Sequence, residues 1–262
     1  TDNASYLVDT TAPTVSSVAI TSATGGQNST LNAGDVVSVT VAMSEAVTVT
    51  GTPQVALNVG GTTVYATYAS GSGTSSLVFT YTIQAGQTDA NGISIAANSV
   101  GLNGGTIADA AGNAATITHS AVTDNASYLV DTTAPTVSSV AITSATGGQN
   151  STLNAGDVVS VTVAMSEAVT VTGTPQVALN VGGTTVYATY ASGSGTSSLV
   201  FTYTIQAGQT DANGISIAAN SVGLNGGTIA DAAGNAATIT HSAVADNASY
   251  LVDTTAPTVS SV

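Results

Sequence analysis

The chain of 262 residues contains no Lys, no Arg and no Cys, and its 14 acidic residues give a formal net charge of −14. This charge disfavours nucleic acid and anionic membrane surfaces as partners, because both recruit basic side chains, and the missing cysteines exclude disulfides and thiolate metal sites. With 43% hydrophobic residues the chain is too apolar for disorder, and no apolar run approaches the ~18 residues of a membrane-inserted span.

A long internal repeat dominates the sequence. Residues 1–122 recur without a substitution as residues 123–244, and residues 245–262 begin a third copy that differs only at Ala245. Such a unit is much longer than the roughly 20–50 residues of solenoid repeats and has the length of an independently folding domain. The repetition therefore predicts domains in tandem.

Within one repeat, apolar residues alternate with polar or small ones, which is typical of strands with one buried face. Turn-forming Gly, Asn and Asp separate these segments. The pattern predicts an all-β fold of tandem immunoglobulin-like Greek-key β-sandwiches, with about seven strands each and less than about 10% helix. The strands are expected at 14–22, 37–43, 55–59, 62–69, 77–83, 93–101, 105–109 with 114–119, and 126–130.

Several short segments occur together in a fixed order: VDTTAPT at 8–14, SEAV at 44–47, GTPQ at 51–54, GGT at 60–62 and DAAGN at 109–113. In this order they resemble the bacterial immunoglobulin-like repeats of giant biofilm and repeats-in-toxin adhesins, whose units begin with a similar linker. The resemblance covers the whole repeat. It implies a chain that holds an adhesive tip away from the cell and that calcium makes rigid.

The linker places the expected domain boundaries at Asp9, Asp131 and Asp253. Proline biases the residue before it towards an extended conformation, so Ala12 and Pro13 suit a stiff entry into a first strand. Neighbouring repeats are then the expected partners, together with other copies of the chain through unpaired end strands. The predicted segments are the last strand of an upstream repeat at 1–8, complete repeats at 9–130 and 131–252, and the first strand of a downstream repeat at 253–262.

Acidic residues are expected to meet at the ends of each domain and to bind Ca²⁺, which prefers hard oxygen ligands. In an immunoglobulin topology Glu45 would lie in a loop after the second strand, and Asp109 with Asn113 in the loop before the last strand, close to Asp9. The second domain repeats this set. A further set is expected at the opposite end around Asp35, Asp89 and Asn91, although turn formation alone also explains Asp35 and Asp89. The candidate ligands are Asp9, Glu45, Asp109, Asn113, Asp131, Glu167, Asp231, Asn235, Asp89 and Asp211.

Catalytic chemistry is not expected. His119 and His241 occur once per repeat without a second His or Cys nearby, and no Gly-x-Ser-x-Gly nucleophile motif occurs. The composition and the repeats favour a structural spacer on the outside of a bacterial cell. The alternative is a repeated module that binds a carbohydrate or another cell by avidity. Tyr6, Tyr65, Tyr68 and Tyr81 would then form a sugar-stacking surface, although packing in the core or on a sheet face is the favoured role of these rings.

Overall fold

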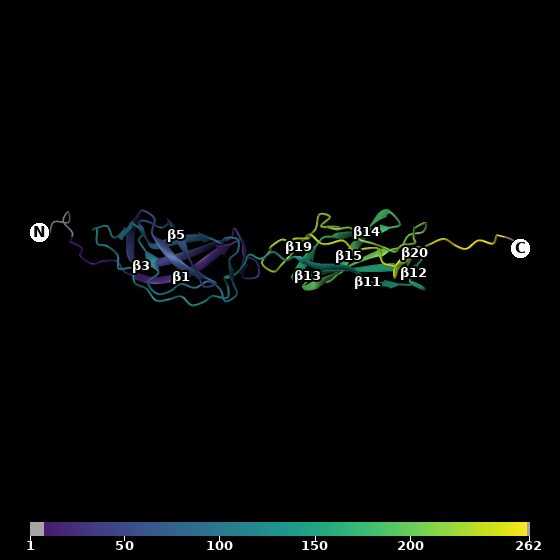
Figure 1. Ribbon diagram of the computed structural model, residues 1–262. Helices are drawn as coiled ribbons and strands as arrows, with labels where there is room; N and C mark the ends of the chain where they lie inside the picture. The colour runs from purple at the N-terminus through teal and green to yellow at the C-terminus, as the bar shows by residue number, and fades with distance from the viewer. Residues whose placement is uncertain (1–7, 261–262) are drawn as a thin grey trace. The chain divides into compact units, whose positions relative to one another are not determined.

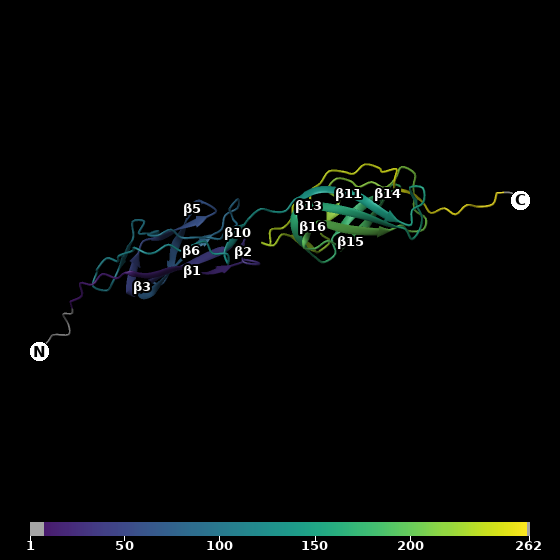
Figure 2. The ribbon, with the colours of Figure 1, turned by 90° about the horizontal axis from the view of Figure 1, so that it is seen from below.

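The computed structural model describes residues 8–260, and these residues form β-strands and no helix. The all-β prediction is confirmed. Contacts divide the chain into two compact units, Thr1–Thr133 and Ala134–Val262, which have the same strands in the same order (Figures 1 and 2). No helix long and apolar enough to cross a membrane is present in the described part.

Unit 1 has ten strands among its described residues, against the expected number of about seven. Five of them are long, and five have only two or three residues. Parts of the expected strands are present only as isolated bridges, as at Ser94, Ile95 and Thr116. The strands are β1 (Val15–Thr24), β2 (Thr30–Leu31), β3 (Val36–Thr50), β4 (Gln54–Val59), β5 (Thr62–Ser70), β6 (Thr74–Thr82), β7 (Thr88–Asp89), β8 (Val100–Gly101), β9 (Thr106–Ala108) and β10 (Leu129–Asp131).

The strands of unit 1 form two sheets. The larger has the order β1-β3-β6-β5-β4-β8, all antiparallel, with β9 paired to the far end of β3. The smaller has the order β2-β10-β7, in which β10 runs parallel to β2 and antiparallel to β7. The non-consecutive order makes neighbours of strands that are distant in the sequence, such as β3 and β6 or β2 and β10.

The core lies on one face of the large sheet and is formed by the apolar stripe of each long strand. Val37, Val39 and Val41 of β3 are completely buried, as is Phe79 of β6, whose ring packs edge-on against Tyr68 with centroids 5.7 Å apart. Complete burial of one such side chain stabilises the fold by about 1.5–3 kcal/mol. The period-two alternation of the sequence is therefore the alternation between core and outer face.

The position of Glu45 in β3 differs from the sequence prediction. Glu45 was expected in a loop, but it lies within β3, which continues for 15 residues. The pairing with β6 is interrupted between Ala42 and Val47, and beyond this point β3 pairs with β9. The irregularity lets one strand serve both neighbours, because the residues between Ala42 and Val47 do not pair with β6. Glu45 therefore projects from an interrupted ladder and not from a flexible loop.

The division between the units falls after Thr133, a few residues beyond the expected boundary at Asp131. Asp131 is the last residue of β10 and pairs with Thr88 of β7. The hydroxyl of Thr132 donates to the carbonyl of Gln87 at 2.9 Å and accepts the amide of Gly86 at 2.9 Å. The start of the linker is thus fastened to unit 1.

Unit 2 repeats this organisation. Its last strand, β20, includes Asp253, and the described residues after it, 254–260, form no strand. The expected upstream strand falls mostly on residues 1–7, and the end of the expected downstream strand on 261–262; both lie outside the described residues. The strands are β11 (Val137–Thr146), β12 (Thr152–Leu153), β13 (Val158–Thr172), β14 (Gln176–Val181), β15 (Thr184–Ser192), β16 (Thr196–Thr204), β17 (Thr210–Asp211), β18 (Val222–Gly223), β19 (Thr228–Ala230) and β20 (Leu251–Asp253).

Candidate metal centre

The segment that leads into β1 is held against two other parts of unit 1. The amide of Thr14 donates to the hydroxyl of Ser44 at 2.9 Å, and the amide of Ser44 donates to the carbonyl of Thr14 at 2.8 Å. On the other side, the amide of Thr116 donates to the carbonyl of Pro13 at 2.8 Å. These bonds place the linker beside Glu45 of β3 and beside the turn that follows β9.

Three carboxylates meet at this place. One carboxylate oxygen from each of Asp9, Glu45 and Asp109 lies within 4.8 Å of the others. Asp9 is exposed, Glu45 is half-buried and Asp109 is buried. These three residues are candidate calcium ligands in the sequence, and the structure places their carboxylates together. Glu45, however, lies in a strand and not in the expected loop.

Asn113 organises the cluster. Its backbone amide donates to Asp109 Oδ1 at 2.8 Å, and its side-chain Nδ2 donates to Asp109 Oδ2 at 2.7 Å. The same Nδ2 reaches the carbonyl of Asp9 at 3.1 Å and that of Thr11 at 3.4 Å. One side chain therefore fixes both the buried carboxylate and the backbone of the linker.

These bonds change the acidity of Asp109. The pKa of its carboxyl group is lowered from the ordinary value of 3.8, chiefly by the side-chain hydrogen bond from Asn113. Burial opposes this by raising the pKa, while the backbone amides of Asn113, Gly112 and Ala111 lower it further. Hydrogen bonds to the charged form favour ionisation, so Asp109 is an anion at neutral pH.

The donor set fits a calcium ion. Calcium takes carboxylate and carbonyl oxygens at about 2.3–2.6 Å, so two oxygens around one ion lie no more than about 5 Å apart. The spacing of the three oxygens, within 4.8 Å, agrees with this limit. Without Lys or Arg in the chain, no protein cation other than a charged His is available to neutralise the carboxylates, whose mutual repulsion disfavours this arrangement.

In unit 2 the arrangement around Asp231 repeats that around Asp109. Asp231 is buried, and Asn235 donates to it from its backbone amide at 2.8 Å and from its side-chain Nδ2 at 2.8 Å. Glu167 lies within β13, as Glu45 lies within β3. Asp131 ends β10 of unit 1, where its Oδ1 accepts the amide of Thr133 at 2.9 Å.

The acidic residues expected at the other end of the unit have structural partners. Asp89 is buried, and its carboxylate accepts the backbone amides of Gly60 at 2.8 Å, Gly92 at 2.9 Å and Asn91 at 3.2 Å. Asp35 accepts the amide of Asn32 at 2.9 Å. Asp211 repeats the bonds of Asp89, with Gly182 and Gly214 as donors. In the described part of the chain, Asp35 and Asp89 belong to no group of three metal-ligating side chains.

The tyrosines considered as a sugar-stacking surface differ in exposure, and two of them have the packing role that the sequence favoured. Tyr65 is 55% exposed, whereas Tyr68 and Tyr81 pack against the core. The hydroxyl of Tyr68 accepts the amide of Ser72 at 2.7 Å. Tyr6 lies outside the described residues. The described side chains therefore leave Tyr65 as an isolated exposed ring.

No family model and no curated protein matches this chain. A solved structure that it resembles is a DUF4785 family protein from Legionella pneumophila subsp. pneumophila, at 10% sequence identity and a TM-score of 0.25. The match covers 84% of this chain and 54% of that protein.

Proposed function

We propose that the chain consists of structural spacer repeats from a long extracellular bacterial adhesin or surface fibre, with immunoglobulin-like units. Three features support this proposal. The units repeat without a substitution, each has its own buried core, and in unit 1 the chain enters at one end and leaves at the opposite end (Figures 1 and 2). A unit of this kind extends a chain without using its surface for chemistry.

Calcium is the proposed cofactor of the spacer. The observation on which this depends most is the meeting of Asp9, Glu45 and Asp109 within 4.8 Å. A bound ion would join the linker through Asp9, the sheet through Glu45 and the turn after β9 through Asp109. It would thereby turn a repulsive contact into a crosslink between three segments.

The sequence repeats this set. Asp131, Glu167 and Asp231 are the counterparts, 122 residues later, of Asp9, Glu45 and Asp109. If the counterparts bind calcium in the same way, the ion restrains the linker that precedes unit 2. Removal of calcium would then loosen this linker, because the three negative charges repel one another.

A repeated binding module is the alternative function. Carbohydrate recognition by stacking requires aromatic rings presented together on the surface, and among the described residues each unit exposes a single tyrosine, Tyr65 in unit 1 and Tyr187 in unit 2. This observation favours the spacer. The two functions also differ in what calcium should change, since a spacer predicts an effect on rigidity without any ligand.

Small-angle X-ray scattering of the two-unit chain tests the proposal. We expect the maximum dimension to be larger and better defined with calcium than with a chelator, and the difference to disappear in the variant Glu167→Gln. The matched control is Gln206→Glu, which changes an exposed side chain of unit 2. An identical maximum dimension in calcium and chelator would contradict the calcium-stiffened spacer.

A further inference from the structure

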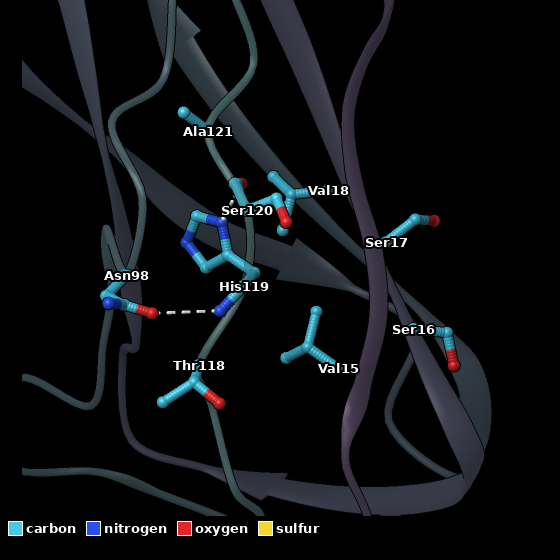
Figure 3. Close-up of a pocket in the computed structure, with 9 residues that line it drawn as sticks. All are labelled: Val15, Ser16, Ser17, Val18, Asn98, Thr118, His119, Ser120 and Ala121. Atoms are coloured by element: carbon cyan, nitrogen blue, oxygen red, sulfur yellow. Dashed lines mark hydrogen bonds between the residues drawn. The ribbon is translucent and has the colours of Figure 1, made fainter.

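A groove of about 500 Å³ lies on unit 1 between Val15–Val18 of β1 and the segment 118–121. Val15 and Val18 point towards this segment, whereas Ser16 and Ser17 point away from it (Figure 3). The other wall of the groove contains His119 and Asn98. The groove recurs in unit 2 with a volume of about 510 Å³ and the corresponding residues.

The ring of His119 is fully engaged. Its Nε2 lies 2.8 Å from the backbone nitrogen of Ser99 and 3.3 Å from that of Val100, and its Nδ1 lies 2.7 Å from the carbonyl oxygen of Ser120. A carbonyl oxygen only accepts, so Nδ1 bears the hydrogen. Both backbone amides donate, so Nε2 offers its lone pair. The bonds therefore require a neutral imidazole in the Nδ1–H tautomer.

Two more bonds tie the same segments together. The backbone amide of His119 donates to the side-chain oxygen of Asn98 at 3.0 Å (Figure 3), and the amide of Asn98 donates to the carbonyl of His119 at 3.2 Å. Asn98 has a positive φ of 60°, a conformation in which Asn is among the more tolerant residues. His119 thus fastens the loop before β8 to the segment 119–120, and this loop is one wall of the groove.

Unit 2 has the same arrangement. His241 Nε2 accepts the amides of Ser221 at 2.8 Å and Val222 at 3.3 Å, and its Nδ1 lies 2.8 Å from the carbonyl of Ser242. The amide of His241 donates to Asn220 at 2.9 Å. The fold therefore uses the only two histidines of the chain in one identical role.

We propose that His119 and His241 are acid-sensitive latches. Protonation places a hydrogen on Nε2, which can then no longer accept hydrogen bonds from the amides of Ser99 and Val100. Both bonds are lost, and the new N–H group faces the two backbone N–H groups. The described residues that line the groove include no other titratable side chain, and residues 96–101 contain none. A charged ring therefore gains no carboxylate partner in the groove. The repulsion between its Nε2–H group and the backbone N–H groups ends only when the loop moves away.

The consequence is a local opening. An imidazole in water binds a proton near pH 6.5, so acidification below this value favours the released loop, in which the ring is hydrated. Because the hydrogen bonds of the closed loop require the neutral ring, proton binding by the ring and opening of the loop are coupled, and acid shifts the equilibrium towards the open loop. The long strands keep their own pairing, so release of the latch changes the groove and leaves the core intact.

Nuclear magnetic resonance of the whole chain at pH 7.5 tests the tautomer first. Ring nitrogen shifts should show Nε2 unprotonated and Nδ1 protonated in both histidines. Amide hydrogen exchange, corrected for its intrinsic pH dependence, should then show the amides of Ser99 and Val100 losing protection between pH 7 and about pH 5. Amides between β3 and β6 should keep their protection over this range. Carboxyl groups of model peptides titrate near pH 4, below this range.

The double variant His119→Gln/His241→Gln is the matched control. A Gln side chain offers an oxygen acceptor that does not titrate in this range, so loop protection should no longer depend on pH. A ring protonated on Nε2 at pH 7.5 would overturn the proposal, as would loop protection that is constant with pH in the unmodified chain. Persistence of the pH effect in the Gln variant would also overturn it.

Discussion

Asn113 holds Asp109 by two hydrogen bonds, one from its backbone amide at 2.8 Å and one from its side-chain amide at 2.7 Å. The second bond comes from the same nitrogen that contacts the carbonyl of Asp9. The geometry of the acidic cluster therefore depends on the neutral side chain of Asn113. Its Nδ2 is a hydrogen-bond donor and not a metal ligand.

The double variant Asn113→Ala/Asn235→Ala should lower the melting temperature by several degrees in chelator. Truncation removes a donor from a buried carboxylate in each unit, and an unsatisfied buried acceptor destabilises a fold. Differential scanning calorimetry measures the change. Thr63→Ala, at an exposed position of β5, serves as control and should leave the melting temperature unchanged.

Acid should destabilise the chain in a way that Asn113 controls. The pKa of Asp109 is below its ordinary value, so its ionised form stabilises the fold above the pKa of the unfolded chain. This stabilisation is lost as the pH falls through the lower pKa of the folded state. Urea unfolding between pH 5 and pH 2 measures it. In Asn113→Ala the free energy of unfolding should depend less steeply on pH in this range. An equal dependence would show that the side-chain hydrogen bond from Asn113 does not lower the pKa of Asp109.

Asp89 and Asp211 should stabilise the fold equally with and without calcium. The carboxylate of Asp89 accepts three backbone amides, and removal of the acceptor leaves these donors without it. We expect Asp89→Ala to cost unit 1 about 1–3 kcal/mol. The measurement is chemical denaturation in calcium and in chelator, and a cost that appears only in calcium would instead identify Asp89 as a ligand.

Substitution by Ala should cost much more stability at Phe79 than at Tyr65. Phe79 is completely buried, whereas Tyr65 is 55% exposed. Phe79→Ala should destabilise unit 1 by about 3–5 kcal/mol because it leaves a cavity. Tyr65→Ala should change the stability by less than about 0.5 kcal/mol. A glycan array screened with Tyr65→Ala/Tyr187→Ala and with the unmodified chain tests the alternative function, since binding that depends on these rings would contradict a passive spacer.

The alternation of apolar residues was sufficient to predict an all-β chain, because burial of one strand face requires a period of two. It also contained a signal that places Glu45 on a strand: Val47 and Val49 continue the odd-numbered stripe of Val37 to Met43. The assumed immunoglobulin topology placed Glu45 in a loop, whereas in the structure Glu45 lies at the interruption where β3 changes partners.

The role of His119 could not be predicted from the sequence. Its partners, Ser99 and Val100, contribute backbone amides, and the side chains of a sequence give no information about where an amide points. At Asp35 and Asp89 the structure shows the turn-forming contacts that the sequence also allowed. Each carboxylate is occupied by amides of nearby turns, which is the turn-forming role that Asp commonly has in such positions.

Calcium binding by the acidic clusters is the central proposal for this chain, and isothermal titration calorimetry of the two-unit chain measures it directly. We predict saturable binding with a dissociation constant of about 0.1–1 mM, as in extracellular calcium modules, and loss of that binding in the double variant Glu45→Gln/Glu167→Gln. The control Gln84→Glu/Gln206→Glu, at exposed positions, should bind as the unmodified chain does. If the folded, unmodified chain showed no saturable calcium binding in this range, the proposal of a calcium-stiffened spacer would be wrong.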